Sequence, residues 1–246
     1  QCCQCWQWKF IGELSELLEV KDLLKRSDLY EKKGKYQHAY CMDLDREGDI
    51  RSVMNIKNNE KWMSTILHEL GHGVYWKYIN KELPFLIRDV SHILTTEAIA
   101  LLFERNSKKI SFLKHFCKSL PKNIEEFGKE IEKALQYREL IFSRWSQVIF
   151  NFEKALYDNP DQDLNKLWWE LVKKFQLIDF SRDRPDWASK IHFVSSPVYY
   201  HNYLLGELFA SQINDYIANK ILKVEPVSNL DYVGKQEIGQ YLKSKV

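Results

Sequence analysis

The sequence predicts a mainly α-helical protein with one small antiparallel β-hairpin. From Phe10 onward, apolar residues recur at intervals of three and four along most of the chain, which is the spacing of amphipathic helices. Two extended runs, 36–44 and 50–56, are joined by the turn-forming segment 45–49 and indicate the hairpin. With 246 residues and 45% hydrophobic content, the chain can bury one substantial core, so we expect a single domain over residues 1–246.

The helices follow in order, each bounded by a break in the apolar spacing. The first is expected from Phe10 to before Lys33, and after the hairpin Asn58 or Asn59 can cap a helix over 60–79. The pattern is lost over 181–196, which indicates an irregular connection. Further helices are expected over 90–103, 123–157, 164–175, 197–222 and from about 232 to the C-terminus.

Charge and hydropathy exclude two classes of partner. The 36 basic and 34 acidic residues are scattered through every segment, with a net charge of +2, so there is no long basic run of the kind that binds nucleic acid. The apolar stretch 204–210 is interrupted by Gly206 and Glu207 and falls far short of the ~20 residues that cross a bilayer. We therefore expect neither a nucleic-acid partner nor a membrane span.

The N-terminal segment reads Gln-Cys-Cys-Gln-Cys, without an initiating Met or a signal core, so we expect the native start to lie upstream. Cys2 and Cys5 have a spacing that can hold zinc, but no second pair of ligands lies near them or Cys3, which favours a disordered or artefactual end. Cys41 and Cys117 are isolated and suit a reducing compartment. We therefore expect a cytoplasmic location.

Residues 68–72 read His-Glu-Leu-Gly-His and predict a metal site. Residues four apart share one face of a helix, so a single ion can join His68 and His72. Glu69 is turned about 100° away, where it can activate the attacking water as a general base.

Catalytic zinc usually takes three protein ligands. Glu97 lies in the apolar stretch 95–102, where an unpaired carboxylate would be costly to bury, so it is the expected third ligand. The alternatives are a chance motif in a charged helix and a partly exposed Glu97 that pairs with a lysine. We predict one zinc ion held by His68, His72 and Glu97.

These residues together resemble the angiotensin-converting enzyme family, the gluzincin peptidyl-dipeptidases, with the thimet oligopeptidases as more distant relatives. The family has a His-Ala pair thirty residues before its first zinc histidine, and His38 and Ala39 have that place here (68 minus 38). Residues 97–99, Glu-Ala-Ile, match the segment of the glutamate ligand. The resemblance implies that His38 and Ala39 lie on an edge strand that binds the substrate backbone.

A second block, residues 190–203, resembles the family's Lys-x-His and Tyr-x-x-Tyr segment, with a spacing that differs by one residue. The resemblance implies that His192 and Tyr203 donate hydrogen bonds to the scissile carbonyl as it becomes an oxyanion. It also implies that Lys190 and Tyr200 hold the C-terminal carboxylate of the peptide. From spacing alone, core packing of two tyrosines on a helix is the alternative.

The sequence departs from the family at three points. Asn202 replaces an arginine that helps to bind chloride in the animal enzymes, and Leu101 replaces an aspartate that supports a zinc ligand, which leaves that support to Glu104 or another residue. Family catalytic domains are also far longer than 246 residues. The resemblance therefore implies a gluzincin half-domain, truncated at both ends and lacking the N-terminal lid region, with the hairpin beside the zinc helix.

The expected activity is zinc-dependent hydrolysis of short peptides, with release of dipeptides from the C-terminus. An oligopeptidase that cuts inside short peptides stays open as the neighbouring alternative. A hypothesis of another class is an inactive, zinc-containing binding fragment, whose partner would be the missing N-terminal part of the full-length protein.

Overall fold

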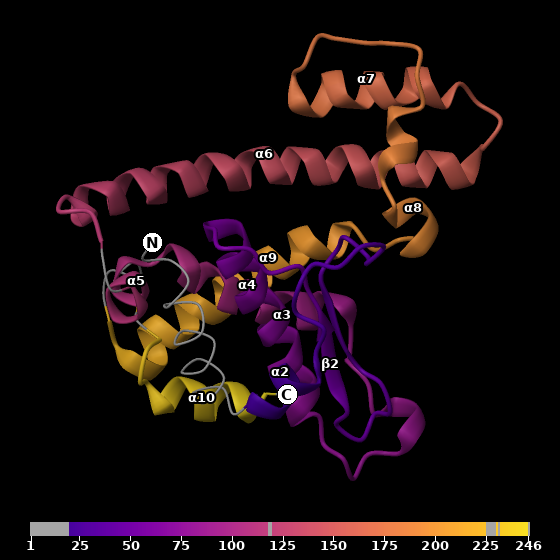
Figure 1. Cartoon of the computed structure of the whole chain (residues 1–246). Coiled ribbons are helices and arrows are strands. Elements are labelled where there is room, and N and C mark those ends of the chain that lie inside the picture. The colour runs from indigo at the N-terminus through magenta and orange to yellow at the C-terminus, as the bar shows by residue number, and fades with distance from the viewer. Residues whose placement is uncertain (1–19, 118–119, 225–229, 231, 246) are drawn as a thin grey trace. The chain divides into compact units, whose positions relative to one another are not determined.

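The computed structural model describes residues 20–117, 120–224, 230 and 232–245. Helices make up most of these residues, and the sheet among them has two strands (Figure 1), which confirms the predicted mainly α fold with one hairpin. The chain divides into two compact units, one formed by residues 1–129 and 206–246 and the other by residues 130–205. The expectation of one catalytic domain over the whole chain stays a prediction.

The first unit contains the hairpin and the helices around it. Its elements are α2 (Lys21–Arg26), β1 (Tyr40–Asp43), β2 (Ile50–Val53), α3 (Glu60–Tyr78), η1 (Phe85–Ile87), α4 (Ile93–Glu104), η2 (Arg105–Lys108), α5 (Ile110–Phe116), most of α9 (His201–Tyr216), the π-helix η4 (Ile217–Leu222) and α10 (Gln236–Lys243). The second unit contains most of α6 (Ile124–Asp158), then α7 (Leu164–Gln176), η3 (Asp186–Ser189), α8 (His192–Ser195) and the start of α9. No helix in the described ranges combines the length and the apolar character that a bilayer span requires.

The hairpin is antiparallel, as predicted, but its strands are shorter than the runs 36–44 and 50–56. Its register runs from the pair Tyr40 and Val53 to the pair Asp43 and Ile50. Beyond β2, the N–H groups of Met54 and Ile56 donate to the carbonyls of residues 28 and 29. Residues 36–39 lie outside the ladder, with His38 in a bend, so the expectation that His38 and Ala39 lie within a strand is wrong.

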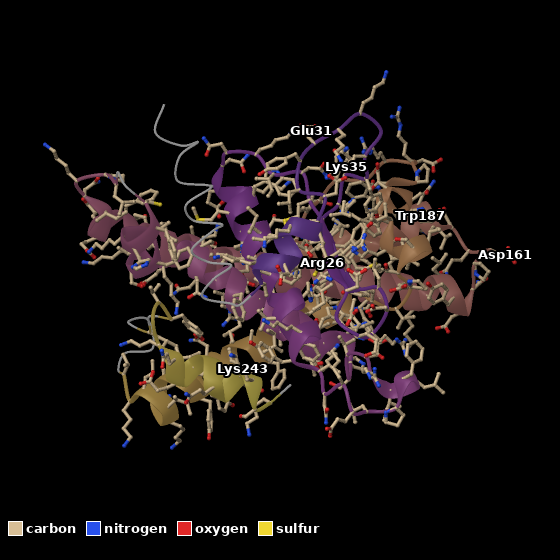
Figure 2. The ribbon with its side chains drawn as sticks, turned by 60° about the horizontal axis from the view of Figure 1, so that its bottom comes forward. Arg26, Glu31, Lys35, Asp161, Trp187 and Lys243 are labelled. Atoms are coloured by element: carbon tan, nitrogen blue, oxygen red, sulfur yellow. The ribbon has the colours of Figure 1, made fainter. Side chains whose placement is uncertain are left out.

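The first predicted helix ends earlier than expected. Its residues 10–19 lie outside the described residues, and α2 ends at Arg26 because Ser27 is extended and Asp28 forms a parallel bridge with Val53. Lys35, labelled in Figure 2, then holds this segment to the hairpin: its ammonium donates to the carbonyls of Asp28 and Tyr30, at 2.8 Å each, and to that of Met54.

Three other helices begin later than predicted, and α4, expected from residue 90, starts at Ile93. The expected helix 197–222 starts at His201, because Val198 has a φ of 56° and donates its N–H to a carboxylate oxygen of Glu153. The last helix starts at Gln236 rather than near 232. The expected irregular connection 181–196 contains only the short helical turns η3 and α8.

Helix α3 carries the His-Glu-Leu-Gly-His segment and begins and ends within one residue of the predicted range. The side chain of Asn59 accepts a hydrogen bond from the N–H of Trp62 at 3.0 Å and caps its start. One face packs on the hairpin, which lies beside α3 in Figure 1, through a cluster of buried apolar residues: Val20, Leu23, Ile50, Met54, Ile56, Met63, Ile66, Leu67, Leu70, Val74, Phe112 and Phe116. This packing fixes the helix that carries the predicted metal ligands.

Helices α3 and α4 approach so closely that only glycine fits at position 71. A Cβ on Gly71 would lie 2.6 Å from the Cα of Ala100. We expect Gly71→Ala to lower the free energy of unfolding by about 1–3 kcal/mol, because the backbone of α4 must move to admit the methyl group. Urea denaturation measures this loss.

Gly239→Ala in α10 is the matched control. An added Cβ there has no atom within 4 Å, so the ordinary helical preference for alanine should raise stability by up to about 1 kcal/mol. An equal rise for Gly71→Ala would show that the close contact between α3 and α4 is absent in solution.

The second unit has its own core. Val148, Ile149 and Phe152 of α6 pack with Trp168 and Val172 of α7, and all five side chains are buried. Asp163 caps α7 by accepting from the N–H of Lys166 at 3.0 Å. Trp187 of η3, labelled in Figure 2, donates its indole N–H to Asn165 at 3.0 Å and joins the connection 181–196 to α7.

Candidate active site

The three predicted metal ligands converge between α3 and α4. Their ligand atoms all lie within 4.8 Å of one another. The Nε2 atoms of His68 and His72 are 3.2 Å apart, and Oε2 of Glu97 lies 3.5 Å from the first and 3.9 Å from the second. Glu97 is only 1% exposed, so its carboxylate faces the two imidazoles inside the protein.

The spacing of these atoms suits a small tetrahedral cation. Ligands at about 2.0–2.1 Å from zinc stand about 3.3 Å apart when the arrangement is tetrahedral. The three observed separations of 3.2, 3.5 and 3.9 Å lie near that value. Two nitrogens and one carboxylate oxygen are also the donor set of many catalytic zinc sites. The residues present therefore fit a zinc ion.

The second ring nitrogen of each histidine, Nδ1, has a hydrogen-bonding partner on α4. Nδ1 of His68 lies 3.0 Å from Oε2 of Glu104, whose other carboxylate oxygen accepts from the hydroxyl of Ser64 at 2.9 Å. Nδ1 of His72 lies 2.7 Å from the hydroxyl of Thr96. Such contacts fix the imidazole that binds a metal and leave Nε2 as the free ligand atom. Glu104 thus supports His68 in place of the aspartate that Leu101 replaces.

The electrostatic field between α3 and α4 attracts positive charge. Burial alone would lower the pKa of His68, but the hydrogen bond to Glu104 and the charges of Glu69 and Glu97 raise it to about 9. Burial, and then the charge of His68, hold the pKa of His72 well below its usual range. The acidic groups that draw a proton to His68 would equally favour a cation at the same point.

Glu69 is buried beside this cluster, on the same helix. It is 5% exposed, and its Oε2 atom has no hydrogen-bond partner among the described residues. Burial raises the pKa of Glu69 to about 7; the charge of His68 opposes the shift and those of Glu97 and Glu104 add to it. A carboxyl group of this kind is matched to proton transfer near neutral pH.

Removal of the Glu104 carboxylate should weaken metal binding without removing a ligand. We expect Glu104→Ala to lower zinc affinity by about 10- to 100-fold, the usual effect of losing an outer support of a ligating histidine. Competition with a chromophoric chelator measures it. Glu82→Ala, at an exposed position, is the control and should leave affinity unchanged. Equal affinities in both variants would mean that the contact between Glu104 and His68 does not orient the ring.

The predicted backbone-binding pair lies just before β1. His38 is exposed in a bend and its ring lies 5.6 Å from that of Tyr36, whereas Ala39 is half-buried and packs against the core of the first unit. One edge of β1 pairs with β2. No strand among the described residues pairs with its other edge. An extended peptide can add to such an edge.

The other four predicted site residues lie together in the second unit. The rings of His192 and Tyr200 are 5.0 Å apart, those of His192 and Tyr203 are 6.0 Å apart, and those of the two tyrosines are 5.4 Å apart. Tyr203 is in the first turn of α9, while Tyr200 precedes the helix. Lys190 lies with its ammonium 4.9 Å from the ring centroid of Trp145.

Sequence reasoning missed two residues of these clusters. Thr96 directly precedes Glu97, and its place one residue before a predicted ligand was the only available signal for its contact with His72. Trp145 lies in the middle of α6, a long amphipathic helix, and the sequence pattern does not distinguish it from the other apolar residues of that helix. Its indole donates a hydrogen bond to the hydroxyl of Tyr200 at 2.8 Å, across 55 residues of sequence.

Comparison with known proteins places this chain in a family. The sequence profile described as Peptidase M2, angiotensin-converting enzyme, matches residues 25–246. Oligopeptidase PepF of Bacillus subtilis (strain 168) is 25% identical over 205 residues, which cover 80% of this chain and 29% of PepF. Among solved structures, PZ peptidase A with inhibitor 2 has the same fold, with a TM-score of 0.67 and 14% identity over 98% of this chain and 48% of that chain. The chain thus spans less than half the length of either relative, and because the profile covers nearly all of it, the chain belongs to the angiotensin-converting enzyme family of zinc-dependent metallopeptidases.

Proposed function

We propose that this chain carries the catalytic centre of a zinc-dependent peptidase that hydrolyses short peptides. The observation that carries the proposal is the convergence of His68, His72 and Glu97 on one point, beside the buried carboxyl group of Glu69. His68 and His72 would hold one zinc ion through their Nε2 atoms, and Glu97 through its carboxylate. When bound, zinc would polarise the peptide carbonyl as a Lewis acid and lower the pKa of water.

Glu69 has the position of a general base, buried beside the proposed metal ligands. Its Oε2 atom accepts no hydrogen bond from the described residues, so it can take a proton from the water that attacks the peptide carbonyl. Once protonated, Glu69 can return that proton to the leaving amine. The scissile C–N bond then breaks while the new C–O bond remains, and the products are a carboxylate and an amine.

The remaining predicted residues bind the substrate. His192 and Tyr203 would donate hydrogen bonds to the carbonyl oxygen as it gains negative charge, since preplaced donors stabilise an oxyanion. His38 and Ala39, which lead into β1, would bind the peptide backbone along the edge of that strand with which no described strand pairs. These assignments are supported by the roles that the matching residues have in the angiotensin-converting enzyme family, and by the grouping of His192 with Tyr203 in the second unit.

Peptidyl-dipeptidase activity is the more specific part of the proposal. It rests on Lys190 and Tyr200, a cation and a hydroxyl that together can hold the free carboxylate of a peptide C-terminus. An oligopeptidase that cuts inside peptides is the second candidate, favoured by the likeness to oligopeptidase PepF. The two differ in whether the peptide end is recognised.

A matched pair of substrates tests this difference. In the form of the protein that hydrolyses peptides, we expect kcat/KM for a free-acid peptide to exceed that for its C-terminal amide by at least about tenfold, since about 1.4 kcal/mol corresponds to tenfold in rate. Lys190→Ala should remove most of that preference. Equal values for acid and amide in the unsubstituted protein would favour the oligopeptidase.

Lys174→Ala is the control for this experiment. Lys174 also lies over an aromatic ring, 5.0 Å from the centroid of Phe175, and it is exposed in the same unit. Its removal should leave the acid-to-amide ratio unchanged. If Lys174→Ala lowered the acid-to-amide ratio as much as Lys190→Ala does, the effect would be a general one of charge, and the assignment of Lys190 would be overturned.

An inactive, zinc-containing binding fragment is the candidate from another class. Its specific support is the exposure of Tyr137, Leu140 and Ile141 on α6, at 63%, 58% and 60%, which a further part of a longer polypeptide could cover. The buried carboxyl group of Glu69 favours the enzyme, because a purely structural zinc site has no use for a general base. Zinc-dependent hydrolysis that chelation removes would decide for the enzyme.

A further inference from the structure

A buried carboxylate holds the turn between α8 and α9. Glu153 of α6 is 6% exposed, and its Oε1 atom accepts a hydrogen bond from the N–H of Val198 at 2.6 Å and another from the hydroxyl of Tyr157 at 3.0 Å. Figure 1 shows the chain passing from α8 to α9 beside the C-terminal part of α6. Both donors are uncharged, so no cation in these two contacts offsets the cost of burying the carboxylate.

Val198 has a backbone conformation that valine rarely adopts. Its φ of 56° lies in the left-handed region, where the branched Cβ of valine crowds the backbone. The other non-glycine residues with positive φ in the described ranges are Arg46, Leu177 and Lys223, and none of them is β-branched. The side chain of Val198 is exposed, so burial does not impose this conformation. The hydrogen bond to Glu153 stabilises it, because an ionised acceptor makes such a bond stronger than a neutral one does.

This turn separates the two predicted oxyanion donors. His192 lies six residues before Val198 (198 minus 192), and Tyr203 lies five residues after it (203 minus 198). Helical hydrogen bonding begins directly after the turn, where the N–H of Tyr203 donates to the carbonyl of Tyr200 at 3.2 Å. The rings of His192 and Tyr203 are 6.0 Å apart. A negative φ at position 198 would direct the following chain elsewhere, so the left-handed turn decides where α9 begins relative to His192.

We propose that Glu153 is a positioning residue for the oxyanion donor Tyr203. Its carboxylate stabilises the left-handed conformation of Val198, and this conformation sets the first turn of α9 so that the ring of Tyr203 lies beside that of His192. Glu153 acts through the backbone and is not itself a catalytic residue. This inference rests on the proposed function through the role of Tyr203 as a donor to the oxyanion.

Steady-state kinetics of the form of the protein that hydrolyses peptides test this role. Glu153→Ala should lower kcat by about 10- to 100-fold, the effect of misplacing a catalytic group by about 1 Å. It should leave KM unchanged, because the contact with the oxyanion is made only in the transition state. Glu153→Gln keeps the shape and an acceptor oxygen and should cost less. Glu132→Ala, at an exposed position on the same helix, is the control and should change neither constant.

Glycine at position 198 should restore the rate that Glu153→Ala removes. Glycine adopts a positive φ without steric cost, so the turn no longer depends on the carboxylate, and Val198→Gly combined with Glu153→Ala should recover most of the lost kcat. Val198→Ala keeps a Cβ and therefore the penalty for positive φ, so in the same combination it should recover much less. If glycine recovered no more than alanine does, the proposal would be overturned.

A second pair of substitutions tests whether the effect passes through Tyr203. Tyr203→Phe should lower kcat by about 10²- to 10³-fold, as the loss of one oxyanion donor does. In that background Glu153→Ala should cause little further loss, because the hydroxyl that it positions is already gone. A mere loss of folded protein would instead lower kcat by the same factor in both backgrounds, and that result would overturn the proposal.

Hydrogen exchange tests the contact itself without hydrolysis or metal. In the whole chain, prepared with isotope-labelled valine and observed by NMR, the amide of Val198 should exchange at least about tenfold faster in Glu153→Ala than in the unsubstituted protein, the effect of losing a hydrogen bond to a charged group. Equal exchange rates in the two proteins would mean that the contact is absent in solution and would overturn the inference.

The outcomes distinguish this inference from the function on which it rests. If Tyr203→Phe lowers kcat but Glu153→Ala does not, the oxyanion role of Tyr203 stands and only the role of Glu153 is wrong. If Tyr203→Phe leaves kcat unchanged, the proposed oxyanion role fails, and the inference fails with it.

Discussion

Glu69→Gln is expected to lower kcat/KM for peptide hydrolysis by about 10²- to 10⁴-fold, the contribution of a positioned general base. Glutamine has nearly the shape of glutamate but cannot take a proton from water. The carboxyl group of Glu69 is buried beside the predicted ligands without being one of them, so its replacement should leave the metal content of the protein unchanged. Rate and metal content are measured on the same preparation.

The control for Glu69→Gln is Glu82→Gln, the same substitution at an exposed position. It should leave both the rate and the metal content unchanged. Because Glu69 is buried, thermal unfolding of the variant must be followed as well, to show that the fold is retained. A folded, metal-loaded Glu69→Gln variant with the original rate would contradict the mechanism.

His72→Ala and Glu97→Ala are each expected to abolish zinc binding at stoichiometric concentrations. Each removes one of three ligands, so the loss should exceed the roughly 10- to 100-fold effect of removing an outer support such as Glu104. Hydrolysis should disappear with the metal. Metal analysis after dialysis against a weak chelator measures the retained zinc.

His115→Ala is the control for the ligand variants. His115 is exposed at the end of α5 and belongs to no cluster of possible metal ligands among the described residues. Its removal should leave one zinc per chain. Full zinc retention in His72→Ala and Glu97→Ala would contradict the assignment of the ligands, and loss of zinc in all three variants would point to a general loss of structure.

The elements with strong local signals could be predicted from the sequence. Helix α3 combines an Asn cap with regular apolar spacing, and the four-residue interval between His68 and His72 then places both rings on one face. Glu97 was predictable because a lone carboxylate in an apolar helix needs a partner, and it is buried against the histidines.

The features that the sequence did not predict depend on contacts between distant segments. Helix α2 ends at Arg26 because Asp28, two residues further on, pairs with β2 and donates its N–H to the carbonyl of Ser52. Helix α9 begins at His201 because the N–H of Val198 is held by Glu153, 45 residues earlier. The hydrogen bond between Trp145 and Tyr200 likewise joins residues that are 55 positions apart. Local propensity carries no information on such pairings.

X-ray absorption at the zinc edge tests the central claim most directly, because it reports the atoms bound to the metal. For the chain loaded with one zinc, we expect only nitrogen and oxygen neighbours, at about 2.0–2.2 Å, with the multiple-scattering pattern of two imidazoles. Glu97→Ala should change the first shell, and His115→Ala should not. A sulfur shell at about 2.3 Å would instead place the metal on cysteines, such as Cys2 and Cys5, and would contradict a site formed by His68, His72 and Glu97.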